Sequence, residues 1–189
     1  MTPPEEREQL IVAERRGSQD PLHLLSARFA ESHGSDDLAK IMDVDVGVLL
    51  VDDMLVKTDR ASMAHSLEAR VPLLDTVVAD LALALPSRLK VRGFSKKWLL
   101  KRAAGPLVPD SIIQGEKRGF DVPLARWLQG ELKPLVREVL AADNLNRQGF
   151  FRPDTVRRLI DEHLAGRADQ HRKIWALLTF SLWYDRYVA

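Results

Sequence analysis

Helical spacing of apolar residues runs through most of this sequence, whereas signals for β-strands are scarce. Residues 155–164, for example, place apolar side chains three and four positions apart, which is the spacing of one helical face. Runs that alternate between apolar and polar residues are few and short. The sequence therefore predicts a mainly α fold.

Proline, glycine and capping residues divide the chain into helical segments. The pair Asp20-Pro21 is typical of an N-cap followed by proline at the first helical position, and Ser35 or Asp36 can cap the next helix. Gly47 lies inside that helix, and Pro72 begins another. The predicted helices cover residues 5–16, 22–31, 38–66 with bends, 72–85, 96–104 capped by Ser95, 124–128, 132–140, 155–164 and 171–187, with an extended piece at 89–91 and a loop around a short helical turn at 108–123.

Composition narrows the class of protein. Hydrophobic residues make up 46% of the 189, which is enough for a packed interior, and 28 basic residues are balanced by 27 acidic ones. With this balance the chain has no net positive field that would attract nucleic acid or an anionic membrane, so neither is predicted as a partner. The absence of cysteine excludes disulfides, thiolate zinc sites and a cysteine nucleophile within the chain. No apolar run could span a bilayer, and the first residues lack the order of a secretion signal, so we expect a cytoplasmic protein.

A polar stripe follows one face of the helix predicted after residue 38. Asp53, Lys57, Arg60 and Ala64 fall at i, i+4, i+7 and i+11, so they share that face. On the residues alone, a solvated face with ion pairs worth a few tenths of a kcal/mol each is favoured over a ligand-binding face. Shortly afterwards, Glu68 and Arg70 precede a proline at a helix junction. They could form a buried pair that fixes the junction, or the guanidinium could bind a carboxylate or phosphate.

A second polar constellation is the segment 114–123, where two cations, Lys117 and Arg118, stand between Gly115 and Gly119. Glycines allow the backbone to approach a ligand closely, and a lysine is a compact charge for a phosphate. Such a loop could cradle a polyphosphate and neutralise charge as it develops. An exposed loop with incidental basic residues remains the alternative.

The remaining polar and aromatic residues suggest structural roles. The histidines are not at metal-ligand spacing, and we predict no metal site. We expect them to face solvent or to lie at helix ends: His23, His33, His65, His163 and His171. Large side chains near the C-terminus are expected in a core or an interface: Trp175, Leu178, Leu182, Trp183 and Tyr184.

Three motifs together resemble the asparagine synthetase (glutamine-hydrolysing) family. Residues 59–75, DRASMAHSLEARVPLLD, resemble the "DR.SMA.SLE.RVPFLD" signature of the bacterial members. Residues 94–101 look like the family's "K.LLR" helix, and residues 116–123 resemble its "PK.GF.VP" loop. They follow in family order, which is far more specific than one short motif. The match predicts an asparagine-synthetase-like helical domain over 37–189, preceded by a poorly matched N-terminal helical segment over 1–36.

The resemblance implies a fold and a chemistry. The fold would be the helical C-terminal portion of an α/β adenine-nucleotide alpha hydrolase-like (ATP pyrophosphatase) synthetase domain, without its parallel sheet. In this family ATP adenylates the side-chain carboxylate of aspartate, pyrophosphate leaves, and ammonia attacks the acyl-adenylate to give the amide and AMP. By resemblance, Lys117 would be the catalytic residue that contacts the phosphates. The wall of the same site would comprise Asp53, Lys57, Asp59, Arg60 and Arg118, and the structural signature would comprise Glu68, Arg70, Pro72 and Asp75.

Several departures limit what the chain is expected to do alone. It has no phosphate-binding loop of the form Ser-Gly-Gly-x-Asp-Ser and no glutaminase domain with its N-terminal cysteine. ATP and Mg²⁺ are therefore expected only in the complete site, and no activity is expected from this chain alone. The expected partner is the N-terminal half of the synthetase domain or the same enzyme's other domains, and association of two copies stays open. Two other functions remain: a non-catalytic helical interaction module derived from a synthetase, or a synthetase that closes β-lactam rings or cyclises peptides.

Overall fold

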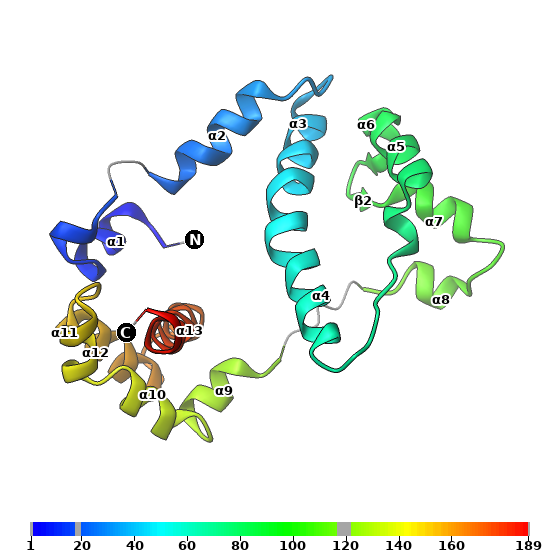
Figure 1. Ribbon diagram of the computed structural model, residues 1–189. Helices are drawn as coiled ribbons and strands as arrows, with labels where there is room; N and C mark the ends of the chain where they lie inside the picture. The colour runs from blue at the N-terminus through cyan, green and yellow to red at the C-terminus, as the bar shows by residue number, and fades with distance from the viewer. Residues whose placement is uncertain (1, 18–19, 117–121, 189) are drawn as a thin grey trace. The chain divides into compact units, whose positions relative to one another are not determined.

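Helices dominate the computed structural model, which describes residues 2–17, 20–116 and 122–188 (Figure 1). In this part of the chain the strands are β1 (Val91–Arg92) and β2 (Ser95–Lys96), which pair antiparallel. The prediction of a mainly α fold without a parallel sheet is thus confirmed for the described residues. None of their helices is long and apolar enough to cross a membrane.

Two compact units make up the chain. The first, here called the terminal unit, combines Met1–Asp20 with Arg118–Ala189, and the second, the central unit, comprises Pro21–Lys117. The boundary expected between residues 36 and 37 on grounds of family resemblance stays a prediction.

The terminal unit is a helical bundle with a well-formed core. Its elements are α1 (Pro4–Leu10), the 3₁₀ helix η1 (Ala13–Arg15), α9 (Leu124–Gln129), α10 (Lys133–Val139), α11 (Ala142–Gln148), α12 (Pro153–Leu164) and α13 (His171–Tyr187). Residues Val156, Leu159 and Ile160 of α12 are buried at i, i+3 and i+4. The same spacing buries three residues of α13, namely Ile174, Leu177 and Leu178.

The N-terminal segment is fastened to this bundle by its backbone. The amide of Arg152 donates to the carbonyl of Leu10 at 2.9 Å, and the amide of Val12 donates to the carbonyl of Phe150 at 3.0 Å. Ile11 therefore pairs with Phe151 as an isolated bridge. The single helix expected over 5–16 is wrong for this reason, since these extended residues separate α1 from η1.

The central unit begins with α2 (Pro21–Glu31) and continues as one helical run over residues 37–63. The elements of this run are α3 (Asp37–Val44), the π-helix η2 (Asp45–Leu55) and α4 (Val56–Met63). Asp36 caps the run as predicted, because its Oδ1 accepts a hydrogen bond from the amide of Ala39 at 2.9 Å. The remaining elements are η3 (Pro72–Leu74), α5 (Thr76–Ala84), α6 (Ser87–Lys90), the β1–β2 hairpin, α7 (Trp98–Ala104) and α8 (Asp110–Ile113).

The π-helix begins beside the one glycine of this run. A Cβ atom on Gly47 would lie 3.0 Å from Nη2 of Arg28, so the absence of a side chain lets the guanidinium of α2 lie against the helix backbone. The long helix with bends predicted over 38–66 therefore exists, and it ends at Met63. Hydrogen bonds of the π type are frequent at functional sites.

Two local predictions around residue 95 are corrected. Ser95 belongs to β2 instead of capping a helix, because Gly93, at φ +56°, turns the chain into a hairpin. Helix α7 consequently begins at Trp98, after Lys97 in the left-handed region. In the terminal unit, α11 was not predicted, and it ends at Gly149, which has φ +69°.

Candidate functional site

The candidate site is built on the C-terminal half of the long helical run in the central unit. Asp53 lies in η2 and Lys57 in the first turn of α4, and Nζ of Lys57 donates to Oδ1 of Asp53 at 3.3 Å. This contact confirms that the two residues share a helical face. Their side chains remain 55% and 66% exposed, so the pair contributes only a few tenths of a kcal/mol to stability. The pair thus leaves both charged groups accessible to a ligand.

Arg60 extends the charged face along α4, whereas Asp59, two residues after Lys57, lies on a different face; both residues are exposed. Within the described ranges neither side chain has an ion-pair partner. Arg60 stands three residues after Lys57, so their cationic groups lie on neighbouring turns of the same face. An ammonium and a guanidinium at this spacing can hold one anionic group, such as a phosphate.

Helix α4 ends in a tight hydrogen-bonded turn at the centre of the 59–75 motif. The amide of Leu67 donates to the carbonyl of Ser62 at 3.0 Å, and the amide of Ser66 donates to that of Met63 at 2.9 Å. This is the Schellman arrangement, in which the residue after the helix adopts the left-handed conformation. Ser66 does so at φ +57°, where glycine is usual. The motif thus contains a strained non-glycine residue beside the charged helical face.

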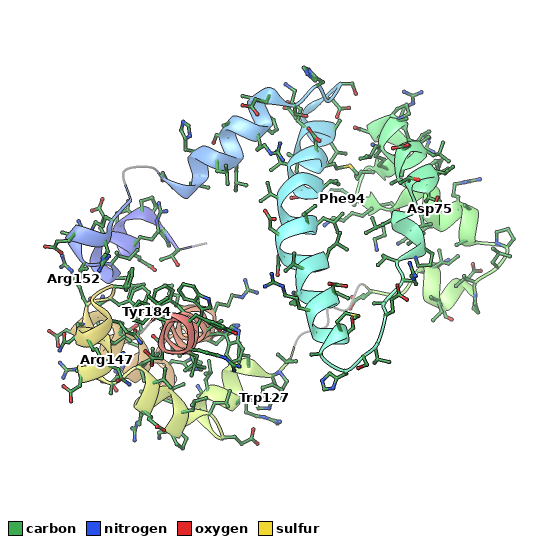
Figure 2. All side chains as sticks on the ribbon, in the orientation of Figure 1. Asp75, Phe94, Trp127, Arg147, Arg152 and Tyr184 are labelled. Atoms are coloured by element: carbon green, nitrogen blue, oxygen red, sulfur yellow. The ribbon has the colours of Figure 1, made fainter. Side chains whose placement is uncertain are left out.

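The residues after this turn direct the chain into α5. Nη2 of Arg70 lies 2.6 Å from Oε1 of Glu68, but their side chains are 81% and 69% exposed. The pair therefore forms as the sequence suggests, whereas the alternative of a buried pair is wrong, because residues 67–71 are all exposed. Pro72 opens η3, and Asp75 caps α5 by accepting from the amide of Val77 at 3.0 Å (Figure 2).

Lys117 and Arg118 lie outside the described residues. The segment before them contains α8, which ends at Ile113, two residues before Gly115. A Cβ on Gly115 would stand 2.9 Å from the carbonyl oxygen of Ser111, so any side chain here would force the end of α8 to move. This close approach is the physical reason for glycine at the position two residues before Lys117.

One histidine lies at a helix end, as expected for rings that do not face solvent, since His163 is in the last turn of α12. His163 in the terminal unit is only 2% exposed. Its Nε2 lies 3.2 Å from the carbonyl oxygen of Ala125, and its Nδ1 lies 3.4 Å from the amide nitrogen of Gln170. Since an amide can only donate and a carbonyl can only accept, the proton resides on Nε2. The buried ring therefore joins α12 to α9 and to the start of α13 as a polar core residue.

Predictions for the C-terminal helix are met in part. Leu178 is buried, but Trp175, Leu182 and Trp183 are 44%, 45% and 50% exposed, so they lie outside the core of this unit. Among the described residues, no group of three or more acidic, histidine or cysteine side chains is arranged to hold a metal ion.

Two carboxylates in other parts of the chain, Asp185 and Asp36, have lowered pKa values. The pKa of Asp185 is lowered by a hydrogen bond from Arg147 at 2.7 Å and by a second bond from Gln148 at 3.0 Å. The pKa of Asp36 is lowered mainly by the amide of Ala39 and then by the hydroxyl of Ser87. Both carboxylates are thus held in the charged form by structural contacts, which fix helices in place.

Comparison with known proteins identifies similar sequences over most of the chain. A sequence model described as asparagine synthase matches residues 2–185. The chain is 38% identical over 157 residues to asparagine synthetase [glutamine-hydrolyzing] 1 of Bacillus subtilis, covering 83% of this chain and 24% of that protein. It is 37% identical over 161 residues to a putative asparagine synthetase [glutamine-hydrolyzing] of Mycobacterium tuberculosis, covering 85% and 24%.

A more distant similarity reaches the human asparagine synthetase [glutamine-hydrolyzing], which is 27% identical over 136 residues. The chain spans about a quarter of the length of these relatives, 24% in each case. No solved structure matches the chain significantly.

Proposed function

Because the chain belongs to the asparagine synthase family, we propose that it forms the helical part of an ATP-dependent synthetase that makes asparagine from aspartate. The observation that carries this proposal is the 38% identity to an asparagine synthetase over 83% of the chain. The accessible charges on η2 and α4 support it, because they lie within and just before the 59–75 motif.

The proposed reaction has two steps. The β-carboxylate oxygen of aspartate attacks the α-phosphorus of ATP, the bond to the β-phosphate breaks, and pyrophosphate leaves. Ammonia then attacks the carbonyl carbon of the acyl-adenylate, AMP leaves with the electron pair of the broken C–O bond, and the nitrogen loses a proton to give the amide. Negative charge develops on phosphate oxygens in the first step, so fixed cations stabilise it.

Residues of this chain would supply those cations from one side of the site. Lys117 would contact the phosphates, and Lys57 and Arg60 would line the same wall from α4. Asp53 would hold Lys57 in place through the 3.3 Å contact until a phosphate oxygen competes for the ammonium group. Mg²⁺ suits the oxygen atoms of pyrophosphate and carboxylates, and the described residues would hold it only together with groups from the rest of the synthetase.

A chain that supplies only one side of a catalytic site is not expected to catalyse the reaction. Catalysis of this kind depends on positioning both reactants and on preorganised charge around them. The charged face of α4 is open to solvent, so water screens its cations. We therefore expect the chain to be inactive by itself and to act only within a complete synthetase.

The test is pyrophosphate release by the purified chain with aspartate, ATP and Mg²⁺, measured beside its Lys117→Ala variant. The expected result is the same background rate for both proteins. Release by the natural chain well above the rate of the variant would overturn the claim that it supplies only part of the site.

A further inference from the structure

The two units differ sharply in how they bury apolar side chains. All eleven described hydrophobic residues that are buried, Leu128 to Leu178, belong to the terminal unit. In the described part of the central unit only Ser32 is buried, at 9% exposure. Large apolar residues there remain open to solvent, with Leu81 at 64% and Val77 at 75%. Exposed apolar surface marks an interaction site where it is contiguous.

Three of these exposed residues, Val78, Leu81 and Leu100, line one groove with a cavity volume of 880 Å³. Its lining residues come from α3, the start of η2, α5, α6, the β1–β2 hairpin and α7. Figure 1 shows the course of these elements in the central unit. The apolar lining of the groove includes Leu38, Met42, Val78, Leu81, Leu99 and Leu100. A groove lined by leucine and valine from several helices has the shape and chemistry that receive the apolar face of another helix.

A hydrogen bond ties the opposing walls together at one end. Oγ of Ser87, at the start of α6, donates to Oδ1 of Asp36 at 2.7 Å, and the same oxygen accepts from the amide of Ala39. The two residues are 51 positions apart in sequence, so this contact links α3 to α6 directly. This hydrogen bond sets the spacing between the start of α3 and the start of α6 before a ligand binds.

The charges around the groove are mainly positive. Among the described lining residues, Lys90, Lys96 and Lys97 are cationic, and only Asp45 is acidic. Nζ of Lys90 donates to the carbonyl of Leu83 at 3.0 Å, so this cation is fixed beside the apolar floor. An occupant with acidic residues along the edges of its apolar face would complement these lysines.

We propose that this groove binds an amphipathic helix with acidic edges from the part of the synthetase that this chain does not contain, an inference that rests on the proposed function. About three quarters of the length of the relatives lies outside the aligned region, so a complete synthetase would contain further segments that could bind in the groove. A second copy of the chain fits less well. Pairing two grooves across a two-fold axis would bring the lysines of both rims together.

The first experiment measures binding of a labelled helical peptide to the full chain by fluorescence anisotropy. The peptide has leucine along one face and glutamate along both edges of that face, and a matched peptide has lysine in place of glutamate. We expect the acidic peptide to bind at least about tenfold more tightly than the basic one, and more weakly as salt is added. Equal binding of the two peptides would overturn the charge complementarity.

Variants of the chain locate the peptide. Leu81→Glu places a charge in the groove at an exposed position, so it should leave the fold intact and weaken binding by about tenfold or more. Leu107→Glu is the matched control, since Leu107 is 84% exposed in the same unit and does not line the groove. Equal affinities of the two variants would show that the peptide binds elsewhere and would refute the proposal.

The occupant is tested in a chimera of the Bacillus subtilis relative in which this chain replaces the aligned quarter. Amide hydrogen exchange should slow in α3, α5 and α7 of the chimera relative to the chain alone. Equally fast exchange in a folded chimera would refute the proposed occupant, as would a dimer of the chain alone that Leu81→Glu dissociates. If amide exchange in the groove slows but the chimera releases no pyrophosphate, only the proposed function is contradicted. If the chimera releases pyrophosphate but amide exchange in the groove does not slow, only this inference is contradicted.

Discussion

The buried histidine of the terminal unit gives a quantitative test of how that unit is held together. His163→Ala removes a ring that is 2% exposed, together with its bonds to the carbonyl of Ala125 and the amide of Gln170. Two hydrogen bonds contribute about 0.5–1.5 kcal/mol each, and the cavity left by a buried ring costs about 2 kcal/mol more. We expect the free energy of unfolding to fall by about 3–5 kcal/mol.

Urea unfolding followed by tryptophan fluorescence measures this change. Trp98 is the one tryptophan in the central unit, so a Trp98→Phe background makes the signal report the terminal unit, through Trp127, Trp175 and Trp183. Analysis of the midpoint at unchanged slope then gives the difference in stability.

His171→Ala is the matched control for this measurement. His171 is 26% exposed and contacts Asp169 at 2.7 Å on the surface of the same unit, so its loss should cost less than about 1 kcal/mol. If the His163 and His171 variants lose the same small amount, the ring is not a buried bridge between helices, and the argument for this core is refuted.

Three further predictions concern single side chains. Ser66→Gly relieves the left-handed strain after α4, so amide exchange at that helix end should slow by about fivefold, and faster exchange would contradict the Schellman turn. The lowered pKa of Asp185 stabilises the folded unit above the usual 3.8, and this stability is lost as pH falls through the lowered folded value. Asp185→Asn should therefore be less stable at pH 7 and decline less below pH 4 in urea unfolding, and an unchanged decline would count against the Arg147 contact. Asp53→Asn should alter the free energy of unfolding by less than about 0.5 kcal/mol because the pair with Lys57 is exposed, and a loss above about 1 kcal/mol would indicate a structural role.

Most helices of the chain follow from local sequence signals. Asp20-Pro21 precedes α2, Asp36 caps α3, and the apolar spacing of 155–164 matches the buried face of α12. These features depend on neighbouring residues, which is why sequence predicts them. The family resemblance, which rests on residues 59–75 and 116–123, is likewise confirmed by the match over 2–185.

Features that depend on distant contacts could not be predicted. The ring of buried His163 contacts the carbonyl oxygen of Ala125, which is far from it in sequence. It also contacts the amide of Gln170, which is near it in sequence. The π-helix follows from no residue pattern in Asp45–Leu55, although Gly47 signals an irregularity. In the candidate site, spacing predicted the contact between Asp53 and Lys57, because helical geometry alone sets it.

The groove of the central unit could not be predicted from the sequence either. Spacing of leucine and valine in α5 and α7 predicts apolar helical faces, but it does not indicate which faces lack a partner. Only the exposed fractions, such as 64% for Leu81, distinguish an open face from a packed one.

Pyrophosphate release by the chimera tests the central claim most directly, namely that this chain supplies one wall of a synthetase site. With aspartate, ammonia, ATP and Mg²⁺, the chimera should release pyrophosphate and form asparagine, and Lys117→Ala should abolish both without unfolding the protein. The chain alone should do neither. A folded chimera that is inactive, or one whose activity survives Lys117→Ala, would contradict the account.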